Sequence, residues 1–160
     1  MRNPQVTPER SRLMSRVRGK NSKPEMIVRR LVHSIAYRYR LHRRDLPGSP
    51  DLVFPKRRKV LFVHGCFWHR HKGCRMTTTP KTRAKFWLDK FAANEARDAR
   101  NMLSLKAKGW KAEVIWECET RNLSSLERKV RAFLGPPKIR DHAPGSIVKR
   151  FRRACKKPCS

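Results

Sequence analysis

The sequence predicts an α/β fold in which a small mixed β-sheet is flanked by helices. Three observations predict it: an apolar stripe with helical spacing near the start of the chain, short apolar strands around a turn in the middle, and a long helical pattern that leads into an alternating strand and a last helix. Helices and strands in this arrangement build layers around one core. The 160 residues are enough for one such domain with basic extensions.

The first helix is signalled by its cap. Residues 1–20 are polar and rich in arginine, and we expect them to form a basic arm that contacts a partner. Ser22 is a suitable N-cap, Pro24 lies in the first turn, and Glu25 completes a capping box. The apolar stripe of this helix is formed, at four-residue spacing, by Ile27, Leu31 and Ile35.

Three strands are predicted next. Aromatic and basic residues alternate over residues 37–44, which is typical of an edge strand. A Pro-Gly-Ser-Pro turn at residues 47–50 leads into a short strand over residues 51–54. After a hairpin tip, the mostly apolar residues 59–63 form another strand, which we place in the centre of the sheet.

The second half of the chain adds two helices and a strand. Residues 86–108 have a helical pattern, and residues 110–118 alternate cleanly between apolar and polar side chains. A capping box at residues 124–127 begins the last helix. We expect a flexible basic tail over residues 136–160, and hence a folded domain over residues 21–135.

Positive charge dominates the composition. The chain holds 41 Lys and Arg against 12 Asp and Glu, which gives a formal net charge of +29. Because this charge is spread along the whole chain, it is typical of a protein that binds a polyanion, above all nucleic acid. Charge alone leaves open a protein that binds RNA or DNA without any chemistry.

The composition also argues against several classes of protein. No run approaches the ~20 apolar residues that a membrane-spanning helix needs, and the start of the chain lacks the apolar block of a secretory signal. The five cysteines are an odd number, which points to a reducing compartment. Two of them, Cys155 and Cys159, lie in the predicted tail and are interpreted as free thiols.

One loop is dense in ligand-type side chains. Cys66, His71 and Cys74 form a C-x₄-H-x₂-C pattern, and Cys118, at a predicted strand end, is able to supply a fourth ligand. Three thiolates and one imidazole make a closed tetrahedral zinc site of the structural kind. Two alternatives stay open: the cysteines are ordinary buried residues, or another histidine of the loop replaces His71.

Asp51 carries the candidate chemistry. It opens a strand that pairs with one ending at His64, so the two residues are expected to lie near one another. A carboxylate beside imidazoles in a positive field suits Mg²⁺-assisted attack on a phosphodiester, with Glu25 as a second carboxylate. The alternatives are a turn-capping role for Asp51, and zinc ligation or an ordinary loop position for His64 and His69.

The aromatic side chains of this region allow two interpretations. Phe67 and Trp68 are adjacent in the hydrophilic loop, and Trp87 lies on the next helix. A buried core position is the usual role for such residues. Adjacent aromatics in a polar loop are nevertheless hard to bury fully, and apolar side chains inserted between base steps are a known way to open DNA.

Several separate motifs together resemble the very-short-patch (Vsr) mismatch-repair endonucleases. The resemblance covers roughly residues 7–135, with the motifs in the family's order and at its spacing. The matching stretches are Arg16–Glu25, Tyr37–His42, Pro47–Phe54, Val63–His69, Phe86–Leu88, Gly109–Trp110 and Val114–Cys118.

The resemblance implies a restriction-endonuclease-like core with a structural zinc site. It also implies a Mg²⁺-dependent enzyme that nicks one strand of double-stranded DNA 5′ to the thymine of a T:G mismatch, which arises when 5-methylcytosine deaminates. The nick starts very-short-patch repair. We therefore expect a monomeric bacterial protein of the cytoplasm, associated with the nucleoid and with no membrane partner.

The resemblance also assigns the site residues. Asp51 matches the family's metal-binding aspartate, and the backbone carbonyl of Val63 matches a further ligand of the same Mg²⁺. His64 and His69 match active-site histidines, with His69 preferred for activating water. Glu25 matches an acidic residue near the water molecules of the metal.

Two further sets of residues follow from the resemblance. The implied ligands of the structural zinc are Cys66, His71, Cys74 and Cys118. The aromatics implied to intercalate beside the mismatch are Phe67, Trp68 and Trp87. The N-terminal arm is expected to lie against the DNA.

The chain departs from the family pattern in three places. Residue 63 is Val where the family has Thr, the spacing from His71 to Cys74 is one residue longer than in some members, and the tail after Gly135 lies outside the pattern. Two competing functions therefore remain. One is a nonspecific or structure-specific nuclease on the same scaffold, and the other is a zinc-stabilised nucleic-acid-binding protein without catalysis.

Overall fold

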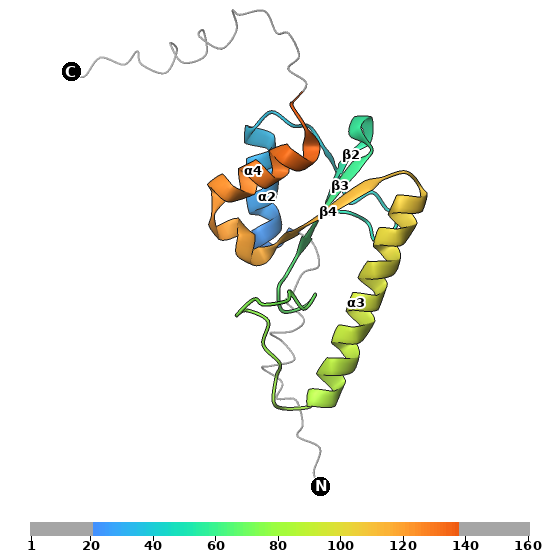
Figure 1. The fold of residues 1–160 in the computed structure, drawn as a ribbon, viewed down its shortest axis with the longest axis vertical. Helices are drawn as coiled ribbons and strands as arrows, with labels where there is room; N and C mark the ends of the chain where they lie inside the picture. Colours follow the sequence, from blue (N-terminus) through green and yellow to red (C-terminus); the bar gives the residue numbers. More distant parts are fainter. Residues whose placement is uncertain (1–20, 138–160) are drawn as a thin grey trace, which may run out of the picture.

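The computed structural model describes residues 21–137, which form a four-stranded mixed sheet with helices on both of its faces (Figure 1). The predicted arm of residues 1–20 and the tail from residue 138 onward, with Cys155 and Cys159, lie outside the described residues. Within residues 21–137, no helix is both long and apolar enough to cross a membrane. The predicted α/β class is confirmed.

Helices and strands are interspersed along the chain. In order, the elements are α2 (Lys23–Ser34), β1 (Arg40–Leu41), β2 (Leu52–Phe54), the 3-10 helix η1 (Pro55–Arg57), β3 (Lys59–His64), α3 (Ala84–Ala107), β4 (Lys111–Trp116), the 3-10 helix η2 (Glu117–Arg121) and α4 (Leu123–Leu134).

The strand directions bring the candidate site residues to one end of the sheet. The strand order is β1-β2-β3-β4. β2 is antiparallel to β1 and β3, so Asp51, directly before β2, lies at the same end as His64, the last residue of β3. β4 runs parallel to β3 because α3 carries the chain back, and its register pairs Trp116 with His64. η2, which contains Cys118, therefore begins at this end as well.

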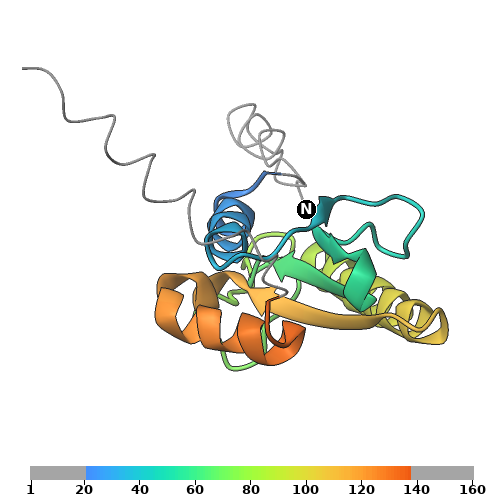
Figure 2. The same cartoon turned by 90° about the horizontal axis from the view of Figure 1, so that it is seen from above.

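Each face of the sheet buries a core of its own, because successive strand residues point to opposite faces. Figure 2 shows α2 and α4 gathered on one side of the strands and α3 on the other. The core under α2 and α4 consists of Val28, Val32, Ile35, Tyr37, Leu52, Phe54, Leu61, Ile115, Leu126, Val130 and Leu134. The smaller core under α3 consists of Leu46, Val53, Val60, Phe62 and Leu105.

The N-cap of α2 is confirmed, since the Ser22 side chain accepts a hydrogen bond from the backbone N–H of Glu25. The predicted capping box is not completed, because the Glu25 side chain accepts from the N–H of Asn21 and not from that of Ser22. The buried residues are Glu25, Val28 and Val32, followed by Ile35, so the predicted stripe is confirmed at Ile35 and is one position off before it. Ile27 and Leu31 are only half-buried, because α2 turns the row that starts at Glu25 toward the sheet.

The later elements match the predictions with two corrections. The central strand, the long helix and the strand after it are all present. That last strand ends at Trp116, so Cys118 lies in η2 and not at a strand end. The N-cap of α4 is Asn122, whose side chain accepts from the N–H of Ser125 at 3.0 Å, and the predicted capping box two residues later is wrong.

Candidate functional site

A cluster of sulfur and nitrogen ligands closes the loop after β3. The ligand atoms of Cys66, His71, Cys74 and Cys118 all lie within 4.8 Å of one another. His71 Nδ1 is 3.6 Å from Cys66 Sγ and 3.3 Å from Cys118 Sγ. A tetrahedral zinc ion with bonds of ~2.3 Å to sulfur and ~2.1 Å to nitrogen separates such ligand atoms by about 3.6 Å. The cluster is therefore consistent with a zinc site that uses Nδ1 of His71.

Neighbouring side chains hold this cluster in shape. The Trp116 ring stacks on the His71 ring, with centroids 4.2 Å apart and planes 3° from parallel. The Thr77 hydroxyl donates to the backbone carbonyls of Cys66 and His71. Burial raises the pKa of the Cys66 thiol to about 12, so this sulfur needs a cation to become the thiolate that binds metal.

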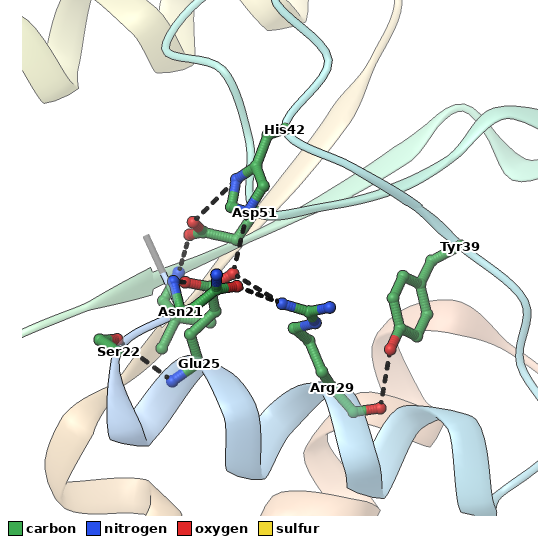
Figure 3. A network of polar contacts seen from close by, with 8 residues as sticks. Asn21, Ser22, Glu25, Arg29, Tyr39, His42 and Asp51 are labelled. Atoms are coloured by element: carbon green, nitrogen blue, oxygen red, sulfur yellow. Dashed lines mark hydrogen bonds and ion pairs between the residues drawn. The ribbon is translucent and has the colours of Figure 1, made fainter. Parts of the chain in front are cut away.

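A second group joins two carboxylates with an imidazole (Figure 3). It consists of Glu25 from the first turn of α2, His42 just after β1, and Asp51 just before β2. Asp51 Oδ2 accepts a hydrogen bond from the backbone N–H of Val63 at 2.7 Å. His42 lies with Nε2 3.1 Å from Glu25 Oε1 and with Nδ1 3.8 Å from Asp51 Oδ1.

The carboxylates of this group lie largely out of solvent, and the described residues do not supply a partner for every oxygen. Glu25 is only 2% exposed, and its Oε1 has no hydrogen-bond partner among residues 21–137. His42 Nε2 has none either, although it lies 3.1 Å from that oxygen. Burial raises the pKa of Asp51 to about 6, the Val63 N–H opposes this rise, and the charge of Glu25 adds to it. A buried, unpartnered carboxylate oxygen beside a second carboxylate fits a hard divalent cation such as Mg²⁺.

A third group contains the two predicted active-site histidines. The rings of His64 and His69 stack with centroids 3.8 Å apart. His69 Nδ1 lies 2.5 Å from Oδ2 of Asp98, which projects from α3. A carboxylate at Nδ1 fixes the orientation of the ring and leaves Nε2 free to exchange a proton. Burial, with a smaller contribution from the charge of His69, lowers the pKa of His64 to about 4, so His64 is neutral at pH 7.

Val63 connects these two groups. It contacts Asp51 through its N–H and is followed directly by His64. The structure thus brings Glu25 together with Asp51, and His64 together with His69. The role of the Val63 carbonyl as a metal ligand stays a prediction.

Two residues of these groups were not among the sequence predictions. His42 lies within the stretch Tyr37–His42, but nothing in its local pattern indicates contact with a carboxylate. Asp98 is 29 residues from His69 and belongs to no motif. The sequence offered one clue to both residues: acidic residues and histidines are scarce, with 12 and 6 in the chain, so each is a candidate for the site.

The aromatic side chains of the loop and of α3 form one cluster. The ring of Phe67 lies 5.1 Å from that of Trp68 and 5.7 Å from that of Trp87, and all three residues are half-buried. Phe91 lies buried beneath them, with its centroid 5.2 Å from that of Phe67. The Asn94 amide donates to the Trp68 carbonyl at 3.1 Å and so ties the loop to α3. The cluster therefore combines one buried ring, that of Phe91, with three rings that are partly accessible to solvent.

Comparison with known proteins adds to these observations. The family model for the DNA mismatch endonuclease Vsr matches residues 5–75. The chain is 56% identical over 132 residues to the type II nicking enzyme V.XorIIP of Xanthomonas oryzae pv. oryzae, covering 82% of this chain and 96% of the relative. It is 40% identical to the type II nicking enzyme V.NmeAIP of Neisseria meningitidis, covering 81% and 91%.

The chain belongs to the Vsr family. A further relative, the DNA mismatch endonuclease Vsr of Escherichia coli, is 36% identical over 117 residues, which cover 73% of this chain and 74% of the relative. The resemblance seen in the sequence is confirmed. This Vsr-family protein is a DNA-nicking endonuclease, a hydrolase of phosphodiester bonds whose substrate is DNA. A nucleic-acid-binding protein without catalysis, considered above, is not favoured by these relatives.

The first prediction concerns the sulfur ligands of this Vsr-family enzyme. Changing Cys118→Ser should remove bound zinc and lower the thermal midpoint, because the loop after β3 has few apolar residues of its own to hold it. Elemental analysis and thermal unfolding measure both effects. The tail variant Cys159→Ser is the matched control and should keep its zinc. Equal zinc content in the two variants would contradict the assignment.

The second prediction uses the raised pKa of Asp51. The folded state binds the Asp51 proton more tightly than the unfolded chain, so Asp51 stabilises the fold below pH 4, and this contribution is lost as the pH rises through about 6. Asp51→Asn should therefore increase the free energy of unfolding at pH 8, in buffer without Mg²⁺, by roughly 1–3 kcal/mol. At pH 4 the gain should be much smaller.

Asp89→Asn is the control for this measurement. Asp89 lies exposed on α3, where its one ion pair within residues 21–137 is with Lys85, so its substitution should change stability little at either pH. A gain at pH 8 that is equal in both variants, or absent from Asp51→Asn, would show that burial of Asp51 does not strain the fold.

Proposed function

We propose that this Vsr-family endonuclease nicks one DNA strand 5′ to the thymine of a T:G mismatch left by deamination of 5-methylcytosine, and so starts very-short-patch repair. The observation that carries the proposal is the aromatic cluster of Phe67, Trp68 and Trp87, which begins two residues before His69 in the same loop. A mismatched step costs less to open than a matched one. An aromatic wedge next to the reacting groups therefore favours a mismatch as the substrate.

The proposal assigns two metals to two sets of residues on a restriction-endonuclease-like core. Asp51 and the Val63 carbonyl hold Mg²⁺, with Glu25 beside them, and Cys66, His71, Cys74 and Cys118 hold a structural zinc. When bound, Mg²⁺ supplies positive charge that offsets the charge building up on the scissile phosphate. The loop after β3 carries His69, Phe67 and Trp68 between Cys66 and His71, and it follows Val63 directly, so its position depends on both sets of residues.

The histidines divide the proton chemistry between them. His69 takes a proton from the attacking water at Nε2, because Asp98 occupies Nδ1 and stabilises the protonated ring. His64 stays neutral, since its pKa is lowered to about 4. It therefore supports the phosphate or the water as a hydrogen-bond partner, and its stacking against His69 keeps that ring in place.

The rest of the chain supplies DNA contacts in this proposal. The endonuclease domain spans residues 21–135, the basic arm of residues 1–20 lies against the DNA, and the tail of residues 136–160 adds positive charge. The enzyme acts as a monomer. Each Lys or Arg that neutralises a phosphate releases counterions, so binding should weaken steeply as the salt concentration rises.

Two relatives are named type II nicking enzymes, a name that mentions no mismatch. A nuclease that nicks matched DNA is therefore the competing function. Both functions use the same acid and imidazole groups, and only the choice of substrate separates them.

The third prediction tests this choice. Matched and T:G-mismatched duplexes with identical flanks, drawn from a panel of flanking sequences, are incubated with the zinc-containing protein with and without Mg²⁺. We expect Mg²⁺-dependent nicks 5′ to the mismatched thymine and at least tenfold slower nicking of matched DNA. Asp51→Asn should abolish nicking and leave DNA binding largely intact.

Other outcomes discriminate clearly. Equal nicking of matched and mismatched duplexes would replace the proposal by a nuclease without mismatch selection. Nicking that continues without Mg²⁺, or in Asp51→Asn, would remove the cation and Asp51 from the mechanism. The matched control is Asp89→Asn, which should nick like the wild type because Asp89 is exposed on α3 and belongs to none of these groups.

A further inference from the structure

We propose that His42 is a positioning residue of the cation site, whose imidazole holds the Glu25 and Asp51 carboxylates at the spacing that a divalent cation requires. The inference rests on the proposed function, since it deepens the role of the same two acids. It concerns a side chain to which the catalytic scheme above gives no part.

The register of the sheet places His42 beside Asp51. Leu41 pairs with Leu52 across β1 and β2, so the next residue, His42, comes opposite Asp51. The backbone of His42 has a φ of 44°, in the left-handed region that side chains other than glycine seldom adopt. Such backbone strain persists where the surrounding structure enforces it, and it is often found at functional sites.

The two carboxylates have the same pattern of contacts. Glu25 Oε2 accepts from the backbone N–H of Asn21 at 2.6 Å, and Asp51 Oδ2 accepts from the N–H of Val63 at 2.7 Å. Each acid thus has one oxygen fixed by the backbone. The other two oxygens, Glu25 Oε1 and Asp51 Oδ1, are the ones that face the nitrogens of His42.

These remaining oxygens are the atoms available to a cation. Glu25 Oε1 has no hydrogen-bond partner among the described residues, and the guanidinium of Arg29 lies 3.6 Å from it through Nη1. Figure 3 shows the His42 ring beside the two acids, with one contact from the ring to each of them. Because the ring is rigid and its side chain is only 16% exposed, it restricts both carboxylates to orientations in which these oxygens converge. Groups that orient metal ligands in this way affect metal affinity by about 10–100-fold.

The fourth prediction measures cation binding directly, without DNA. Mn²⁺ serves as the probe, and its electron paramagnetic resonance signal reports free ion during titration of the full-length, zinc-containing protein. His42→Ala should weaken binding at least tenfold. His42→Gln, whose amide still reaches a carboxylate, should stay within about threefold of the wild type. Asp51→Asn defines the signal that belongs to this site.

The matched control is His33→Ala. His33 lies exposed on the same helix as Glu25, and its loss should leave Mn²⁺ binding unchanged. In nicking assays, His42→Ala should require about tenfold more Mg²⁺ for half-maximal rate while KM for DNA stays at the wild-type value. A purely structural role would lower the thermal midpoint without this selective change.

The outcomes separate the two proposals. Wild-type Mn²⁺ affinity in folded His42→Ala would overturn the role of His42 while leaving Mg²⁺-dependent nicking intact. If His42→Ala does not fold, His42→Leu, which keeps the bulk of the ring, decides by the same criterion. Binding by His42→Gln as weak as by these apolar variants would also overturn it. A wild-type protein that neither binds Mn²⁺ at Asp51 nor nicks with Mg²⁺ would instead overturn the proposed function.

Discussion

The structure depends on a buried carboxylate at the point where two antiparallel strands meet. Asp51 is fixed by the Val63 N–H, and burial raises its pKa to about 6. Ionising this group therefore costs more in the folded protein than in the unfolded chain, and a cation beside it would offset that cost. Glu25 at the start of α2 and His42 after β1 face the same space, so residues from three separate parts of the chain converge on a place whose ligand atoms fit a divalent cation.

The site contains two sets of candidate metal ligands that differ in their chemistry. The sulfur and nitrogen cluster suits zinc and closes a loop that holds no helix or strand between β3 and α3. The carboxylate group suits a harder ion. The same loop carries His69, Phe67 and Trp68, and it is anchored on α3 through the contact of Phe67 with Phe91 and through the Asn94 contact to the Trp68 carbonyl. The way the loop folds therefore determines where the reacting groups lie.

Much of this arrangement could be predicted where the signal is local. The cap at Ser22, the central strand and the spacing of Cys66, His71 and Cys74 are short-range patterns, and the structure contains each of them. His42 and Asp98 could not be found this way, because strand register and helix packing bring them to their partners. The buried row of α2 was misassigned by one position, since apolar residues occupy neighbouring rows of that helix and only tertiary contacts choose between them.

The most direct test of the account is the position of a bound cation. Crystals of the protein with a T:G-mismatched duplex and Mn²⁺ would locate the ion by its anomalous scattering. The account predicts a peak within about 2.3 Å of Asp51 Oδ1, with Glu25 and His42 next to it. No peak at that position, or an Asp51 carboxylate turned away from the scissile phosphate, would contradict it.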